Sequence, residues 1–155
     1  MEMLFVCTGN TCRSPMAEGL MNHMAKKNGL DIEAKSAGIF TWVGQNVSEE
    51  AVEVIKEEGI DISSHKSRLI TRNLVEEADL ILTMTVGHKE QLLSGYGCYD
   101  FLDGKIYTLK EYAYGVEEDI EDPFGRGIQA YKNAKDEIKE AIQEIIDNGQ
   151  LTGDR

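Results

Sequence analysis

One short segment near the start of the chain combines residue types that suit phosphoryl chemistry. The string Cys7-Thr8-Gly9-Asn10-Thr11-Cys12-Arg13-Ser14 separates a thiol from a guanidinium by five residues. A loop of this length curls so that successive backbone N–H groups point at one oxyanion, and Gly9 and Asn10 tolerate the left-handed dihedrals that such a nest requires. Arg13 can then close the ring with a bidentate fork onto two phosphate oxygens. The segment predicts an oxyanion-binding loop with a cysteine at its start.

The same segment is predicted to activate the Cys7 thiol. A helix opened by Pro15 follows the loop, and its positive end, together with the Ser14 hydroxyl, should lower the pKa of Cys7 well below the ~8.5 of a free thiol. Cys7 is then expected to be a thiolate at neutral pH. The alternative is a buried cysteine that only fills space at a strand end. The coincidence of loop glycine, arginine, hydroxyl and helix start favours the chemical interpretation.

Strands and helices alternate along the rest of the chain. Apolar or alternating segments predict strands at 3–6, 32–36, 78–84 and 105–109. Apolar spacing and capping residues predict helices that begin at Pro15, after Ser48, after Thr71, at Val86 and near Ile128. The segment with Tyr112 and Tyr114 is assigned to a long loop that precedes the last helix. The alternation predicts an α/β fold with right-handed crossovers.

The apolar pattern also predicts the order of the strands. Segments 3–6 and 78–84 are almost continuously apolar and should be central, whereas 32–36 alternates and should be an edge. We expect a single domain over residues 1–155, built on an open four-stranded parallel sheet in the order 2-1-3-4 with helices on both faces. Ligands bind such sheets beyond the carboxyl ends of the strands where the winding reverses. Cys7 lies at that point, so the phosphate-binding loop is expected directly after the first strand.

Composition excludes several classes of protein. A chain of 155 residues is about one domain. Its net charge of −12, from 28 Asp and Glu against 16 Lys and Arg, argues against nucleic acid as a partner. The apolar run 3–7 is too short for a signal peptide or a membrane span, so we expect a cytoplasmic protein without a membrane partner. Three cysteines argue against a secreted disulfide framework.

From Val6 to Pro15 the chain resembles the low-molecular-weight protein tyrosine phosphatase family, whose signature has the form Cys-x-Gly-Asn-x-Cys-Arg-Ser-Pro. The resemblance continues through Ser36-Ala37-Gly38, Gly59-Ile60 with His65, and Asp122-Pro123. It implies hydrolysis of phosphorylated proteins through a phosphocysteine intermediate, without a metal or other cofactor. It further implies these roles: Cys7 as nucleophile, Arg13 as holder of the phosphoryl group, Ser14 as stabiliser of the thiolate, and Asn10 with Ser36 and His65 as braces of the loop.

Departure of the leaving group requires a proton donor opposite the nucleophile. Asp122 is the family's candidate, and the alternative is an Asp-Pro pair that only starts a turn. Four neighbouring carboxylates are expected on a solvated face, and like charges favour the protonated acid; they are Glu117, Glu118, Asp119 and Glu121. If this hypothesis holds, neutralising the four moves the basic limb of the pH profile of kcat.

Two positions bear on the substrate. Thr11 stands where the tyrosine enzymes usually carry isoleucine, and Phe124-Gly125 stands where they usually carry two aromatic residues. Both features resemble the protein arginine phosphatase branch of the family, and a planar, polar guanidinium is best held by oxygen atoms. The alternative is neutral variation in a phosphotyrosine enzyme. Phe40 and Trp42 are expected to wall the cleft, with packing in the core as the alternative.

Other interpretations of the loop and of the remaining residues stay open. Thiol-dependent arsenate reductases share the fold but need a later pair of cysteines, and only Cys98 follows. A non-enzymatic phosphate-binding module would keep its function in Cys7→Ser. Cys12 is expected to form a reversible disulfide with Cys7, trapped by peroxide and absent in Cys12→Ser, or else to fill space. His23 and His88 are expected on solvated faces of helices.

Overall fold

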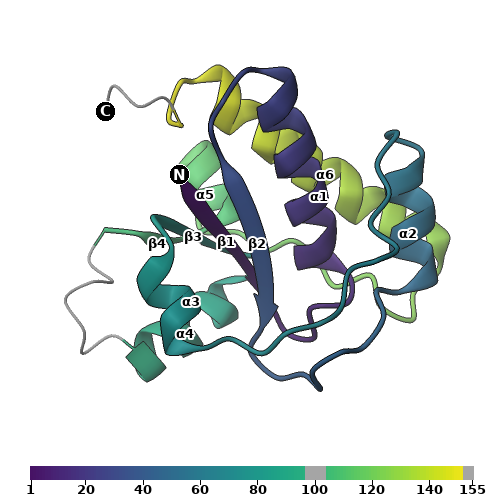
Figure 1. The fold of residues 1–155 in the computed structure, drawn as a ribbon, viewed down its shortest axis with the longest axis horizontal. Coiled ribbons are helices and arrows are strands. Elements are labelled where there is room, and N and C mark those ends of the chain that lie inside the picture. The colour runs from purple at the N-terminus through teal and green to yellow at the C-terminus, as the bar shows by residue number, and fades with distance from the viewer. Residues whose placement is uncertain (97–103, 152–155) are drawn as a thin grey trace.

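The computed structural model describes residues 1–96 and 104–151. Strands and helices alternate along the chain from the first strand to the long last helix (Figure 1). The elements are β1 (Glu2–Cys7), α1 (Arg13–Lys27), β2 (Glu33–Gly38), α2 (Glu49–Lys56), α3 (Arg72–Glu77), β3 (Leu80–Thr83), α4 (Val86–Tyr96), β4 (Ile106–Thr108), α5 (Leu109–Tyr114) and α6 (Ile128–Asp147).

The strands form one parallel sheet in the order β2-β1-β3-β4. The predicted order is confirmed, as are the central positions of β1 and β3 and the edge position of β2. Pairing of Cys7 with Gly38 aligns the ends of β1 and β2. The carboxyl ends of these strands therefore meet at one edge of the sheet, where the phosphate-binding loop begins.

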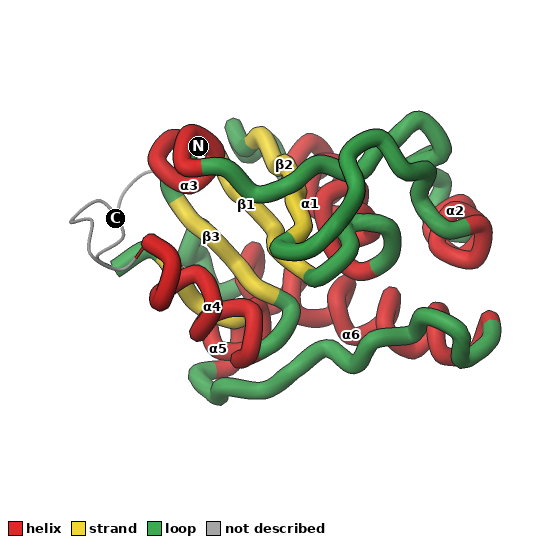
Figure 2. The backbone as a smooth tube through the Cα atoms, turned by 90° about the horizontal axis from the view of Figure 1, so that it is seen from below, coloured by secondary structure: helices red, strands yellow, loops and turns green. Residues whose placement is uncertain are grey.

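Alternate side chains of β1 enter two separate cores. Met3 and Phe5 pack with residues of α1, α5 and α6, whereas Leu4 and Val6 pack with residues of α3 and α4. Figure 2 shows the strands between α3 and α4 on one side and α1 and α6 on the other. Phe5 is fully buried, and burial of such a side chain contributes about 1.5–3 kcal/mol. Helices on both faces, as predicted, hold β1 and its terminal Cys7 rigidly.

Several element boundaries differ from the prediction. The segment assigned to a loop around Tyr112 contains α5, which begins with a capping box between Thr108 and Glu111. β3 is limited to Leu80–Thr83, the four residues that pair with β1. α1 begins at Arg13 rather than at Pro15, since proline is accommodated within the first helical turn.

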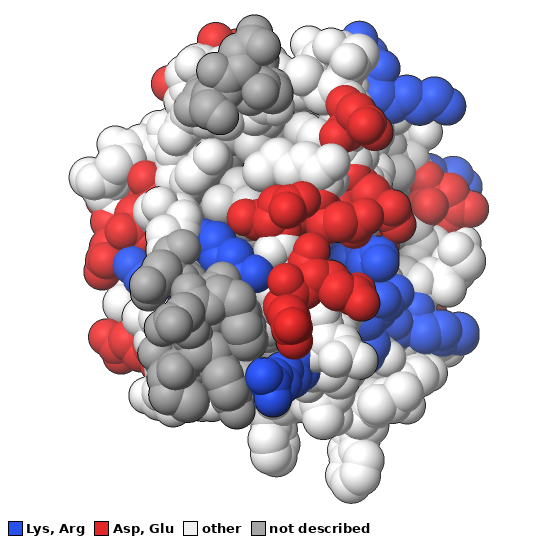
Figure 3. Space-filling view, turned by 60° about the vertical axis from the view of Figure 1, so that its left-hand side comes forward, with Lys and Arg blue, Asp and Glu red and all other residues white. Residues whose placement is uncertain are grey.

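The surface carries the acidic excess of the sequence. Figure 3 shows a face on which Asp and Glu side chains form a broad cluster with Lys and Arg interspersed. Within the described ranges, no helix is both long enough and apolar enough to cross a membrane. Cys98 falls outside the residues that the structure describes.

Candidate active site

A cleft of about 720 Å³ opens at the carboxyl ends of the strands, the end that faces the viewer in Figure 2. Its floor is the segment from Cys7 to Ser14, which we call the phosphate loop. Residues 115–127, between α5 and α6, form one wall, and we call them the acid loop. The lining residues are Cys7, Thr8, Gly9, Asn10, Thr11, Cys12, Arg13, Gly44, Gln45, Asn46, Ser48, Asp122 and Phe124.

Cys7 is buried between the end of β1 and the start of α1. Its Sγ lies 2.9 Å from Ser14 Oγ, and the Asn10 N–H donates to it over 3.3 Å. Burial raises the pKa of the Cys7 thiol and outweighs Ser14, Arg13 and Asn10, each of which lowers it. The prediction of a depressed pKa is therefore wrong here, because the loop that supplies the donors also removes the sulfur from water.

Asn10 connects the phosphate loop to two distant segments, β2 and the loop that contains His65 and Arg68. It is the one non-glycine residue with a positive φ, 56°, among the described residues, a conformation that asparagine tolerates. Its Nδ2 donates to Ser14 Oγ (2.8 Å) and Ser36 Oγ (2.9 Å). Its Oδ1 accepts from the Arg68 N–H (2.9 Å) and lies 3.2 Å from His65 Nε2. Asn10 is fully buried, so these bonds satisfy both ends of its amide.

The bracing continues from Asn10 to α1 through Glu18. Ser36 Oγ donates to Glu18 Oε1 over 2.8 Å, and His65 Nδ1 lies 3.9 Å from Glu18 Oε2. The structure thus brings Ser36 and His65 together with Asn10, as the resemblance implies. Glu18 was not predicted, although its i,i+4 spacing from Ser14 places both on one face of α1.

Gly38 allows β2 to approach the phosphate loop closely. A Cβ at this position would lie 2.6 Å from the Thr8 carbonyl oxygen and 3.1 Å from the Gly9 carbonyl carbon. Any larger residue would therefore push the loop away. Gly9 itself does not adopt the left-handed conformation that the sequence predicts for it, because Asn10 alone makes the reversal.

Arg13 lies between the phosphate loop and the acid loop. The residue is buried, its Nη1 donates to the Ile120 carbonyl over 2.8 Å, and its Nη2 lies 3.7 Å from Asp122 Oδ2. The Asp122 side chain is 56% exposed, and its Oδ1 accepts from the Phe124 N–H over 3.1 Å. Asp122 therefore presents a carboxyl group at the mouth of the cleft above the buried cysteine.

The walls of the cleft are more polar than predicted. Phe40 and Trp42 are 83% and 79% exposed and line neither the cleft nor the core. The Phe40 N–H donates to the Thr8 carbonyl over 3.0 Å, so its main chain rather than its ring adjoins the loop. Gln45 and Asn46 occupy the wall instead. The sequence did not predict them because an irregular loop has no periodic pattern.

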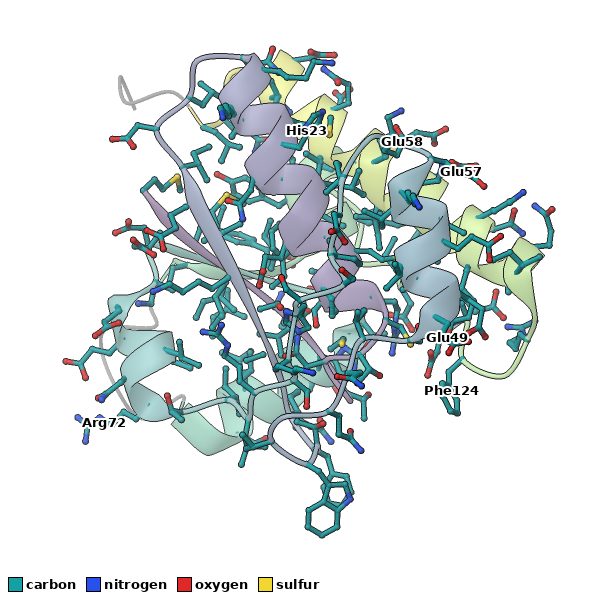
Figure 4. The ribbon with its side chains drawn as sticks, turned by 45° about the vertical axis from the view of Figure 1, so that its right-hand side comes forward. His23, Glu49, Glu57, Glu58, Arg72 and Phe124 are labelled. Atoms are coloured by element: carbon teal, nitrogen blue, oxygen red, sulfur yellow. The ribbon has the colours of Figure 1, made fainter. Side chains whose placement is uncertain are left out.

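Phe124 lines the cleft and is 70% exposed. In Figure 4 its ring extends from the acid loop away from the body of the protein. Thr11, on the floor, is partly exposed and places its Oγ1 3.8 Å from Cys12 Sγ. The cleft thus combines a hydroxyl on its floor with one aromatic ring at its mouth.

Tyr131 of α6 and His88 of α4 contact the phosphate loop from outside it. Cys12 is buried, and its Sγ lies 3.3 Å from the hydroxyl of Tyr131, whose pKa is raised by burial. Cys7 and Cys12 are free thiols in this structure, and the reversible disulfide stays a prediction. On the other side, His88 Nε2 lies 2.8 Å from Thr8 Oγ1.

The expectation that both helical histidines lie on solvated faces is wrong for His88. It is 6% exposed, because the first turn of α4 packs against the phosphate loop. His23 is partly exposed on α1.

A cysteine at the start of an oxyanion loop, with arginine and a carboxyl group across the cleft, defines a cysteine-dependent phosphatase. The family model for low molecular weight phosphotyrosine protein phosphatase matches residues 2–153. A protein-arginine-phosphatase of Bacillus subtilis is 43% identical over 155 residues, all of this chain and 99% of the relative. A low molecular weight protein-tyrosine-phosphatase, PtpB of Staphylococcus haemolyticus, is 42% identical over 96% of this chain and 99% of the relative.

Solved structures agree with these relatives. The YwlE arginine phosphatase, as a C7S mutant with a phosphorylated active-site serine, has a TM-score of 0.92 and 42% identity over all of this chain and 98% of that one. The low molecular weight protein tyrosine phosphatase of T. tengcongensis has a TM-score of 0.89 and 48% identity over 96% of this chain and 99% of that one. The chain therefore belongs to the low molecular weight phosphotyrosine protein phosphatase family, which confirms the resemblance in its sequence.

Proposed function

We propose that this chain is a protein-arginine phosphatase that removes the phosphoryl group from phosphoarginine side chains of proteins. It acts as one catalytic domain, in keeping with the family match over residues 2–153. It works in the cytoplasm, where a thiol nucleophile stays reduced. Its partners are phosphorylated proteins.

The oxygen acceptors among the lining residues of the cleft carry this proposal. Hydroxyl, amide and carboxyl oxygens are offered by Thr11 on the floor and by Gln45, Asn46, Ser48 and Asp122 in the walls. Among the described residues, Phe124 is the one aromatic residue in the lining. A guanidinium is planar and presents several N–H donors, so it gains most from oxygen acceptors. A phosphotyrosine ring gains most from apolar walls on both faces.

The first chemical step transfers the phosphoryl group to sulfur. Cys7 Sγ attacks phosphorus in its thiolate form, which Ser14, Arg13 and the Asn10 N–H favour against the effect of burial. The S–P bond forms, and the P–N bond of phosphoarginine breaks. Arg13 holds two of the phosphoryl oxygens. Asp122 gives its proton to the departing guanidine nitrogen. The products of this step are a phosphocysteine, a free arginine side chain and an Asp122 carboxylate.

The second step releases phosphate. The Asp122 carboxylate takes a proton from a water molecule while the water oxygen attacks phosphorus. The S–P bond breaks, the Cys7 thiolate leaves, and Asp122 is protonated again for the next cycle. Ser14, with its Oγ 2.9 Å from Cys7 Sγ, stabilises the thiolate in both steps. One water is consumed, and no metal or other cofactor takes part.

The relatives support this proposal and also define a second candidate. One relative of nearly identical length is named a protein-arginine-phosphatase, and the phosphorylated serine in the C7S mutant of a similar structure agrees with a phosphocysteine intermediate. Other relatives are named protein-tyrosine-phosphatases at 42% and 48% identity. Hydrolysis of phosphotyrosine is therefore the second candidate.

Phosphate release from a phosphoarginine peptide and a phosphotyrosine peptide of the same sequence distinguishes the two. We expect kcat/KM to favour phosphoarginine by at least about tenfold, because a site built to hydrogen-bond its substrate discriminates against one that leaves those groups unpaired. Thr11→Ile should move the preference toward phosphotyrosine, because it replaces a hydroxyl on the floor of the cleft by an apolar side chain.

Cys7→Ser is the blank for both peptides, and retained phosphate binding without turnover in this variant separates an enzyme from a binding module. A preference of the unmodified enzyme for phosphotyrosine would leave the two-step chemistry in place and overturn the arginine assignment.

A further inference from the structure

We propose that the first turn of α4, Val86–Lys89, fixes the acid loop relative to the phosphate loop. Asp119 and His88 are its positioning residues, and we call this turn with its contacts to Asp119 and Thr8 the bracket. The inference rests on the proposed function, because it concerns the placement of Asp122 opposite Cys7. Neither Asp119 nor His88 lines the cleft. Both therefore act through the residues that do.

The acid loop is attached to this turn of α4 through Asp119 and Glu117. The Val86 N–H donates to Asp119 Oδ1 over 2.8 Å, so an acid-loop carboxylate occupies a free donor at the helix start. Lys89 Nζ donates to Glu117 Oε1 over 2.9 Å and also to Glu111 Oε1 over 2.9 Å. The loop is thereby held three residues before Asp122.

A main-chain hydrogen bond also holds the acid loop at Ile120, the residue after Asp119. The Ile120 N–H donates to the Met84 carbonyl over 2.8 Å, and Met84 in turn donates its N–H to the Val6 carbonyl over 2.9 Å. Ile120 is fully buried. Ile120, the residue after Asp119, is therefore anchored, and the Asp119 carboxylate fixes how the loop enters this anchor on its way to Asp122.

The phosphate loop is attached to the same turn through His88. Its Nε2 lies 2.8 Å from the hydroxyl of Thr8, the residue directly after Cys7. Its own N–H donates to Thr85 Oγ1 over 3.0 Å. His88 Nδ1 is buried without a hydrogen-bond partner among the described residues, so the bond to Thr8 is the polar contact that orients the ring.

Val86 and His88 belong to one helical turn, so the separation between their partners Asp119 and Thr8 follows from rigid helix geometry. Few contacts hold Asp122 itself, because its side chain is 56% exposed, lies 3.7 Å from Arg13 and accepts from the Phe124 N–H of its own loop. A general acid must reach the leaving atom within hydrogen-bond distance, and small misplacements cost large factors in rate. The bracket therefore fixes the distance between Asp122 and Cys7, which the exposed acid loop does not fix alone.

The test compares Asp119→Ala with Asp119→Asn. Asparagine caps a helix about as well as aspartate, so Asp119→Asn keeps the acceptor for the Val86 N–H and removes only the charge. We expect Asp119→Ala to lower kcat/KM roughly tenfold for a phosphoarginine peptide and for phenyl phosphate, whose leaving groups need a proton. 4-Nitrophenyl phosphate, whose leaving group departs without one, should lose much less. Asp119→Asn should restore most of the rate.

His88→Leu provides an independent variant. Leucine keeps much of the volume and removes the bond to Thr8, so the same dependence on the leaving group is expected. Glu118→Ala is the matched control, since it removes an exposed carboxylate of the same loop whose nearest cation, Lys110, lies 4.0 Å away. Asp122→Asn removes the general acid itself and therefore gives the largest loss in kcat/KM that misplacement of Asp122 can cause.

An equal loss with all three substrates in Asp119→Ala would indicate general damage and overturn the bracket. So would an Asp119→Asn rate as low as that of Asp119→Ala, because charge rather than placement would then matter. A Glu118→Ala effect as large as that of Asp119→Ala would do the same. An inactive wild type, or an Asp122→Asn variant without dependence on the leaving group, would overturn the proposed function itself.

Discussion

At the scale of single residues, Cys7 is held between opposing influences. Burial raises the pKa of its thiol, and the Ser14 hydroxyl is the largest of the groups that lower it. Removing that hydroxyl in Ser14→Ala should therefore raise the pKa of Cys7 further, because a hydrogen bond that stabilises the thiolate is lost. The pH dependence of alkylation by iodoacetamide measures this pKa directly, because the thiolate is the reactive form.

Ser63→Ala, which removes an exposed hydroxyl outside the site, is the control for this measurement. An alkylation profile of Ser14→Ala that coincides with the wild type would show that the hydroxyl does not stabilise the thiolate.

The sequence predicted the residues of the phosphate loop better than those of the opposite wall. The five-residue spacing between Cys7 and Arg13 suits a loop that binds an oxyanion, so the residues of this loop could be assigned from their positions in the sequence. Gln45 and Asn46 come from an irregular connection whose path depends on tertiary contacts. The same limit applies to Phe40, whose exposed ring lies in the irregular connection after β2.

At the scale of elements, His88 ties the stability of α4 to pH. Burial and the charge of Arg13 lower the pKa of His88 to about 4, against the opposing charges of Asp119 and Asp122. The unfolded chain takes up this proton near pH 6.5, so between pH 6.5 and 4 it binds more protons than the folded state. The free energy of unfolding should fall as the pH drops through that window, by at most about 2 kcal/mol at pH 5 from this group.

Urea unfolding at pH 7 and pH 5 measures the effect. His88→Leu, which has no proton to take up, should lose less stability between these values than the wild type. Equal losses in the two proteins would mean that His88 titrates normally in the folded state.

Helices and strands with a long apolar pattern were predicted from the sequence, whereas the short helix α5 was not. The apolar runs of β1 and β3 and the apolar stripe of α6 were sufficient for the sheet order and the closing helix. The six residues of α5 carry too few turns for a period, although Thr108 and Glu111 have the spacing of a capping box. The burial of His88 could not be predicted, because it depends on where α4 meets a loop 80 positions earlier.

At the scale of the whole molecule, the net charge of −12 should influence which proteins approach the cleft. Substrate peptides that carry lysines beside the phosphoarginine should show a higher kcat/KM than peptides that carry glutamates, because the field of the protein attracts the former. Raising the ionic strength to about 0.5 M should remove most of the difference, since screening then acts within a few ångströms. A difference that persists at high salt would indicate direct contacts instead.

The Asn10 contacts also determine when in folding the enzyme becomes reactive. Its partners Ser36, His65 and Arg68 lie 26, 55 and 58 positions along the chain. Contacts of such separation form late, because the loop-closure entropy must be overcome first. A nascent chain that has completed β1 and α1 therefore still lacks the template of its phosphate loop. Its nucleophile is assembled only when sequence-remote segments have docked, which makes catalytic activity a report on complete folding.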